Sequence, residues 1–172
     1  MLKWIGICCM IAGCTGMGMS CARDLELRIA ELTQLRQLVM LLKGELRYMR
    51  QPLPEALHRL GEKASPPFAG FLEDTAKEME ERRGESAEAI WRKHLQICSV
   101  GLHLTRQEIK ELERLGNVLG YLDVEMQVNA LDYYLEQLRL SSEQAREAVA
   151  SRKSLYQYMG VLGGIALGIL IF

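Results

Sequence analysis

The chain has 172 residues with 21 basic and 22 acidic side chains, which is enough for one modest domain. This near-neutral balance argues against a nucleic-acid-binding protein, which would carry a clustered excess of basic residues. Leu, Glu, Arg, Ala and Gln are abundant and no strand-like alternation occurs, so the composition predicts an all-α protein.

The first predicted element is a membrane span over residues 4–22, a stretch without any charged residue. In helical conformation, a segment of this length covers a hydrocarbon core of about 30 Å. Ala12, Gly16 and Ser20 are small and lie four residues apart, which places them on one face of the helix. We expect this face to pack against a second span.

An alternative interpretation of the same segment is a cleaved lipoprotein signal. Residues 11–14, Ile-Ala-Gly-Cys, resemble the lipobox of bacterial lipoproteins, in which the cysteine, here Cys14, becomes the lipidated first residue. The apolar stretch before Cys14 is short, however, and the apolar character continues to Ala22. An uncleaved span is therefore the better description of residues 4–22.

Residues 23–153 are predicted to form an antiparallel bundle of six helices. Apolar residues recur along this part of the chain at spacings of three and four, which is typical of helices with one buried face. The expected helices cover about residues 23–50, 55–63, 66–83, 86–100, 105–120 and 123–153. The first is expected to be continuous with the span before it, and the sixth with the span after it.

Prolines and glycines mark several of the expected helix boundaries. Pro52 ends the first helix, because proline disfavours helical geometry at the residue before it, and Pro54 suits the first turn of the second. Gly84 and Gly120 are expected to close the third and fifth helices.

Side-chain caps indicate where other helices begin. Ser65 and Ser86 are expected to cap the third and fourth helices through their hydroxyl groups. Thr105 and Glu108 have the spacing of a capping box, in which each side chain binds a backbone amide of the other residue.

One set of apolar residues is expected to face the core of the bundle. These residues are Leu25, Leu32, Leu35, Val39, Leu42, Leu46 and Met49 in the first helix; Leu57 and Leu60 in the second; Phe68, Phe71, Leu72, Ala76 and Met79 in the third; Ala89, Ile90 and Leu95 in the fourth; Ile109, Leu112, Leu115 and Leu119 in the fifth; and Val124, Val128, Leu131, Leu135, Leu138, Ala145 and Val149 in the sixth.

The last predicted element is a second membrane span over residues 154–172, again without charge. Gly160, Gly164 and Gly168 lie four residues apart, the small-residue spacing that lets helix backbones approach closely in lipid. We expect this glycine face to contact protein, including the first span.

The basic residues near the two spans indicate the orientation in the membrane. Positive residues flanking a span favour the cytoplasmic side, and here they concentrate at the inner ends of both spans. They are Arg23, Arg28, Arg146, Arg152 and Lys153, against Lys3 at the outer end. The helical bundle is therefore predicted to face the cytoplasm.

No enzyme signature occurs in the sequence, such as a glycine-rich phosphate loop or a nucleophile elbow. His94, Cys98 and His103 are the best candidates for a metal site, but they offer three ligands that do not share one helix face, so no metal site is predicted. Carboxylates such as Glu108 and Glu111 are assigned to the solvated faces of helices. We predict no catalytic residue, no cofactor and no small-molecule substrate.

Several segments, taken in order, resemble the stage III sporulation protein AB family, and the resemblance covers the whole chain. The segments are Met1-Leu2-Lys3, Leu35-Arg36-Gln37-Leu38, Glu45-Leu46-Arg47-Tyr48, Pro52-Leu53-Pro54-Glu55-Ala56-Leu57, Leu115-Gly116, Leu119-Gly120 with Asp123 and Gln127, and Tyr158-Met159-Gly160-Val161-Leu162-Gly163-Gly164.

That family is itself similar to the F-type platform proteins of type II secretion systems. The resemblance implies a non-enzymatic subunit of the secretion or feeding apparatus in the mother-cell membrane of sporulating bacteria. It implies two kinds of partner: a cytoplasmic ATPase similar to stage III sporulation protein AA, and other subunits of the same apparatus. The alternative is a lipoprotein or a membrane-tethered sensor or adaptor with an extracytoplasmic helical domain.

Overall fold

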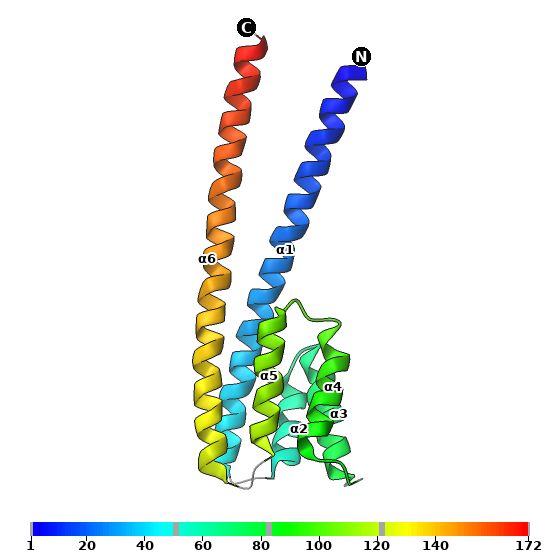
Figure 1. Ribbon diagram of the computed structural model, residues 1–172, viewed down its shortest axis with the longest axis vertical. Helices are drawn as coiled ribbons and strands as arrows, with labels where there is room; N and C mark the ends of the chain where they lie inside the picture. Colours follow the sequence, from blue (N-terminus) through cyan, green and yellow to red (C-terminus); the bar gives the residue numbers. More distant parts are fainter. Residues whose placement is uncertain (1, 50–51, 82–83, 121–122, 172) are drawn as a thin grey trace.

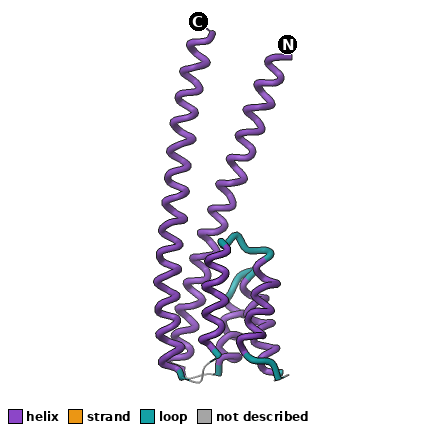
Figure 2. Tube along the Cα trace, viewed as in Figure 1, coloured by secondary structure: helices purple, strands orange, loops and turns teal. Residues whose placement is uncertain are grey.

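In a computed structural model, the chain folds into helices joined by loops (Figure 2). The structure describes the backbone of residues 2–49, 52–81, 84–120 and 123–171. Side chains are described within these ranges from residue 23 to residue 149, and at residue 151. No strand occurs in the described backbone. The helices are α1 (Leu2–Gly44), which continues into the π-helical turn η1 (Glu45–Met49), α2 (Leu53–Lys63), α3 (Phe68–Glu80), α4 (Ala87–Ser99), α5 (Arg106–Leu119) and α6 (Val124–Ile171).

Two long helices, α1 and α6, lie side by side and antiparallel, and the four short helices pack beside one half of this pair (Figure 1). Both long helices extend past the bundle at the same end, which we call the proximal end. The loop between α4 and α5, residues 100–105, lies at the proximal end and is named the proximal loop. At the opposite, distal end, η1 lies beside the first turns of α6. The predicted all-α fold with six α-helices is confirmed.

Most of the predicted core residues are buried. The buried ones are Leu32, Leu35, Val39, Leu42, Leu46, Leu57, Leu60, Phe68, Phe71, Leu72, Ala76, Ile90, Leu95, Leu112, Leu115, Leu119, Val128, Leu131, Leu138 and Ala145. Leu25, Met79, Ile109, Leu135 and Val149 are half-buried. Removal of this apolar surface from water is the main favourable term for packing the six helices together.

Three residues predicted to face the core are exposed, namely Met49, Ala89 and Val124. Met49 ends the π-helical turn, which has more residues per turn than an α-helix and so rotates Met49 away from the stripe formed by Leu42 and Leu46. Val124 is the first residue of α6, at the edge of the bundle. The core also contains residues that the pattern did not predict, among them Leu38, Thr75, Trp91 and Tyr134.

Two of the predicted helix caps are confirmed. The hydroxyl oxygen of Ser86 accepts a hydrogen bond from the Ala89 amide at 3.2 Å. At the start of α5, the Thr105 hydroxyl accepts from the Glu108 amide at 3.3 Å, and the Glu108 carboxylate accepts from the Thr105 amide at 2.7 Å. These bonds satisfy amides that have no partner inside their helices.

The predicted cap at Ser65 is wrong. Helix α3 begins at Phe68, its N-cap residue is Pro67, and no side chain caps it. Pro66 precedes another proline, which disfavours helical geometry at Pro66 and delays the start of the helix.

The third helix also ends earlier than predicted, at Glu80. Carboxylates in the last turn of a helix lie beside the negative end of its dipole, which disfavours further extension. Gly84 has a positive φ of 85°, a conformation that glycine adopts without a Cβ penalty. Gly120 is the C-cap residue of α5, as predicted.

The backbones of α1 and α6 remain helical through the predicted spans, residues 4–22 and 154–172, as far as Ile171. The side chains of the proposed packing residues, Ala12, Gly16, Ser20, Gly160, Gly164 and Gly168, lie outside the described ones. In the part of the chain with described side chains, no helix is both long and apolar enough to cross a membrane. The two spans, and the domain boundaries that depend on them, stay predictions.

Candidate functional site

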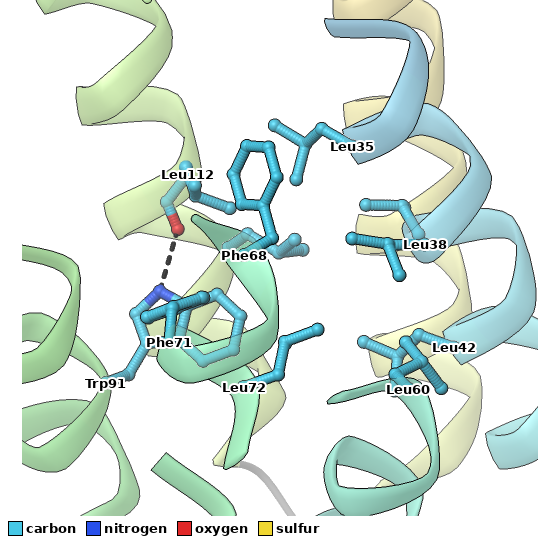
Figure 3. Close-up of a pocket in the computed structure, with 11 residues that line it drawn as sticks. Leu35, Leu38, Leu42, Leu60, Phe68, Phe71, Leu72, Trp91 and Leu112 are labelled. Carbon is cyan, nitrogen blue, oxygen red and sulfur yellow. Dashed lines mark hydrogen bonds between the residues drawn. The ribbon is translucent and has the colours of Figure 1, made fainter. Parts of the chain in front are cut away.

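The core contains a small cavity of about 20 Å³ between α1, α2, α3, α4 and α5 (Figure 3). Its eleven lining residues are all apolar, and its size is close to that of a single water molecule. A water molecule needs two or more polar partners to be stable in such a place. This cavity therefore reflects imperfect packing of large side chains and offers no room for a substrate.

One wall of the cavity is formed by Trp91, which joins three helices. Its indole Nε1 donates a hydrogen bond to the Leu112 carbonyl oxygen at 3.0 Å, and its ring meets Phe71 edge-on with centroids 4.8 Å apart (Figure 3). Gly116 provides the space for this ring, because a Cβ atom at Gly116 would lie 2.1 Å from Trp91 Cδ1. The contact is a structural interlock of α4 with α5.

The three candidate metal ligands have separate partners. His94 Nε2 lies 2.6 Å from Glu78 Oε2, and His103 Nδ1 lies 2.8 Å from Glu31 Oε1. The Cys98 thiol points to the Pro67 carbonyl oxygen at 3.7 Å. No group of three His, Cys, Asp or Glu residues that could hold a metal ion occurs among the described side chains.

The most buried carboxylate of the described bundle is Glu108, which the sequence pattern assigned to a solvated face. This assignment is wrong, because Glu108 is only 5% exposed and pairs with Arg28 of α1. The guanidinium donates two hydrogen bonds to the carboxylate, at 2.7 and 3.2 Å, while the same carboxylate caps α5. A bidentate pair of this kind is both strong and directional.

The environment of Glu108 also sets its protonation. Burial by itself would raise the pKa of the carboxyl group, but hydrogen bonds from Arg28 and Thr105 outweigh burial and hold the pKa below its ordinary value. Glu108 is therefore a carboxylate at neutral pH. Because it cannot donate a proton in that state, it has the character of a structural anchor and not of a catalytic acid.

A second contact fixes the proximal loop to α1. The Glu31 carboxylate accepts a hydrogen bond from the His103 amide at 2.8 Å and lies 2.8 Å from Nδ1 of the same residue. Together with the pair of Arg28 and Glu108, it ties the end of the proximal loop and the first turn of α5 to α1. We call these two contacts the proximal clasp.

The distal end has an open groove of about 590 Å³ between η1 and α6. Its lining residues are Arg47, Val124, Glu125, Val128, Asn129 and Asp132. Directly after Arg47, Tyr48 and Met49 are 79% and 61% exposed. We call the groove together with Tyr48 and Met49 the distal surface. It combines exposed apolar groups with charges of both signs, as protein-binding surfaces do.

Neither the proximal clasp nor the distal surface was predicted from the sequence. Both bring together α1 or η1 with residues far along the chain, and Arg28 and Glu108 are 80 positions apart. The capping-box motif was the one local signal for Glu108. It marked the bond to Thr105 but carried no information about Arg28.

The structure defines an all-α, six-helix bundle whose two terminal helices extend past it at one end. The stage III sporulation protein AB family model matches residues 3–172. The chain therefore belongs to this family of sporulation proteins.

A solved structure titled "Stage III sporulation protein AB (SpoIIIAB)" is also similar, with a TM-score of 0.67 and 23% sequence identity. The match covers 72% of this chain and 97% of that one. At this identity the likeness shows the shared fold alone. No curated protein matches the sequence.

Proposed function

We propose that this chain is a non-enzymatic platform subunit of the sporulation-specific secretion or feeding apparatus in the mother-cell membrane. Its role is to couple a cytoplasmic ATPase, similar to stage III sporulation protein AA, to the other subunits. The observation that carries this proposal is the course of α1 and α6, whose backbones run without a break from the bundle into two uncharged segments at the same end.

Continuous helices suit a subunit that transmits a force or a displacement from the bundle to its predicted spans. A displacement of the bundle would move α1 and α6 as rods, because no flexible linker separates either helix from its predicted span. The family membership of the chain supports a subunit of a sporulation complex. The similarity to F-type platform proteins suggests the same arrangement, with two spans and a cytoplasmic helical domain.

A topology measurement tests the membrane part of this proposal. Cys98 is a poor site for thiol labelling, because burial raises the pKa of its thiol to about 11 and little thiolate forms at neutral pH. We therefore choose a Glu85→Cys variant in which the five natural cysteines are replaced, since Glu85 is exposed. An impermeant thiol reagent should label this variant in inverted vesicles and leave it unlabelled in intact cells.

The opposite result would overturn the cytoplasmic orientation. Labelling in intact cells would place the bundle outside and favour the lipoprotein alternative. A mature N-terminus that starts with a lipid-modified Cys14 would then be expected by mass spectrometry.

For the ATPase, we propose the distal surface as the contact site. It lies at the end of the bundle opposite the proposed spans, where a cytoplasmic ATPase has room to approach. Tyr48 is its most exposed large hydrophobic side chain, and tyrosine often contributes strongly to protein interfaces. Replacing Tyr48 with Ala should weaken co-purification of the ATPase at least about tenfold, the loss typical of an interface hot spot.

Tyr133→Ala provides the matched control for this measurement. Tyr133 is 64% exposed on α6 and does not line the groove. Equal loss of the ATPase in both variants, or no loss in either, would contradict the distal surface as the binding site. Both substitutions should leave the melting temperature unchanged, because neither side chain is buried.

A further inference from the structure

We infer that a second copy of this chain packs along the outer face of α1, so that the α1 helices of two copies lie side by side and parallel. This inference rests on the proposed membrane spans, which hold both helices in the same direction. It goes beyond them by assigning the surface through which two copies meet. That surface, called the outer seam, is a row of residues that recur at alternating spacings of three and four, namely Leu27, Ala30, Gln34, Gln37, Leu41 and Gly44.

The outer seam faces away from the rest of its own bundle. Leu27 and Leu41 are 38% and 44% exposed, and none of the other seam residues is buried. At about 100° of rotation per residue, Gln37 lies about 120° around the helix from Lys43, which pairs with α6. Leu41 lies about 180° around the helix from Leu32 in the core. Neither the core nor α6 therefore covers the outer seam.

The spacing of the outer seam is that of a coiled coil. Parallel helices with such a repeat, which averages about 3.5 residues, wind around each other with their seams in contact. The same alternation continues through Arg23 into the first predicted span, where each position has a small residue, namely Gly6, Cys9, Gly13, Gly16 and Ser20. Small residues let helix backbones approach closely in lipid. Because α1 is one helix from Leu2 to Gly44, a partner that fits the whole row is a helix that follows α1 from the bundle into the membrane.

The α1 helix of a second copy meets this requirement. Its span would cross the same bilayer in the same direction, which makes the two helices parallel. The outer seam has no charged residue, so two identical seams can meet without repulsion. Gln37 is exposed, and its amide carries both donors and an acceptor, so the two Gln37 side chains can bond to each other across a twofold axis. In this pair, Gly16 and Ser20 meet the other copy instead of the second span of their own chain.

The charges at the membrane end of the row also suit a second copy. Arg23 is the one charged residue on the repeat between residues 6 and 44, and Asp24 follows it directly; both are exposed. In a parallel pair in register, Arg23 of one copy and Asp24 of the other lie at the same height, so opposite charges meet on both sides of the axis. The nearby Glu31 carboxylate accepts a hydrogen bond from the His103 amide of its own chain, which limits its repulsion of Glu26 in the other copy.

Disulfide cross-linking in vesicles tests the contact. The purified full chain, with its natural cysteines replaced, carries Gln37→Cys and is reconstituted into phospholipid vesicles before a mild oxidant is added. Facing seam positions bring two thiols within disulfide geometry, so Gln37→Cys should give at least about fivefold more covalent dimer than Arg36→Cys. Arg36 is the matched control, because it is exposed on the same helix and about 100° away from Gln37. Equal yields from the two variants would overturn the contact.

Further variants test the seam and the charges. Leu41→Asp, added to the Gln37→Cys chain, should lower the dimer yield at least about fivefold, because it places two carboxylates opposite each other in the contact. The helical content should not change, since Leu41 is exposed. Asp24→Arg should also lower the yield, and exchange of the two residues by Arg23→Asp with Asp24→Arg should restore it. A yield that ignores all these changes, or a cross-link that forms only to another added subunit, would overturn the pairing of two copies.

Alkaline extraction separates this inference from the proposed function. Loss of the chain from the vesicles would show that the proposed spans are wrong, and the parallel pair would fall with them. A chain that resists extraction but forms no covalent dimer through Gln37→Cys would overturn the pairing and leave the proposed spans intact.

Discussion

Gly116 shows how a single missing side chain can determine the packing of three helices. The Trp91 ring occupies the space that a Cβ atom would need, with its Cδ1 atom 2.1 Å from that position. The ring is held by its hydrogen bond to Leu112 and its edge contact with Phe71, so it cannot shift without losing both. The fit therefore depends on glycine at position 116.

Replacing Gly116 with Ala should lower the free energy of unfolding by about 1–3 kcal/mol, the usual cost of overpacking a core. Thermal unfolding of the full chain in detergent, followed by circular dichroism, measures this change. Gly70→Ala is the control, because a Cβ atom at Gly70 would have no heavy atom within 4 Å. That variant should be unchanged or more stable by up to about 1 kcal/mol, since alanine favours helix. Equal destabilisation of the two variants would contradict the interlock.

Glu108 makes the stability of the bundle depend on pH. Its pKa is lower in the folded chain than its ordinary value of 4.5 in the unfolded chain. The folded state is therefore stabilised fully above the unfolded pKa, and this stabilisation is lost as the pH falls through the folded pKa. Replacing Glu108 with Gln should reduce the loss of stability below pH 4.5.

The same variant should be less stable at neutral pH by about 2 kcal/mol, because the charged hydrogen bonds to Arg28 are weakened. Denaturant titrations at several pH values measure both effects. Glu85→Gln is a suitable control, since Glu85 is exposed. A Glu108→Gln chain with the same pH dependence as the parent would show that other carboxylates dominate acid unfolding.

At the scale of elements, α1 has two distinct faces between residues 32 and 42. Leu32, Val39 and Leu42 face the core, whereas Leu41 on the other side of the helix is 44% exposed. The helix therefore contributes one apolar stripe to the bundle over this stretch. Its continuation η1 ends the stripe and places Tyr48 at the surface.

Replacing Leu46 with Asp should destabilise the bundle by about 3 kcal/mol or more, because a carboxylate without a partner would be buried. Leu46 is 3% exposed, and Leu41→Asp offers the same change on the exposed face of the same helix. Circular dichroism and thermal melting should show a large loss for Leu46→Asp and a small one for Leu41→Asp. Similar melting of both variants would mean that the assigned inner face of α1 is wrong.

At the scale of the whole molecule, the proposed function depends on how the two terminal helices associate in the membrane. Gly160, Gly164 and Gly168 would form the contact face of the second span. Replacing Gly164 with Leu should reduce both spore yield and recovery of the assembled complex, because the bulky side chain separates the helices. The helical bundle should remain folded, since the substitution lies outside it.

Ala166→Leu is the matched control for this prediction, because two residues along an ideal α-helix correspond to about 200° of rotation from position 164. It should allow normal sporulation and normal complex recovery. If Gly164→Leu also behaved normally, the glycine face would have no packing role. If both variants lowered spore yield and complex recovery, the small residues of the span in general, and not the spacing of the glycines, would be responsible for the loss.

Local patterns in the sequence were sufficient for the class of fold and for much of its layout. Hydrophobic periodicity identified the helices, and hydroxyl caps located the starts of α4 and α5, because these signals depend on residues within one or two turns of each other. The resemblance to the stage III sporulation protein AB family was likewise carried by short segments in order, and the family model confirmed it. The errors at Ser65 and Met49 arose where a second proline or a π-helical turn altered the local geometry.

The polar contacts and the surfaces were decided only by the tertiary structure. Nothing near Glu108 in the chain indicates Arg28, and nothing near His103 indicates Glu31, which lies 72 positions earlier. The fit of Trp91 over Gly116 and the groove between η1 and α6 arise in the same way. Helical periodicity determines which face of a helix is buried, but the rotation and height of each helix against its neighbours depend on how all the side chains pack together, and these decide which residues meet.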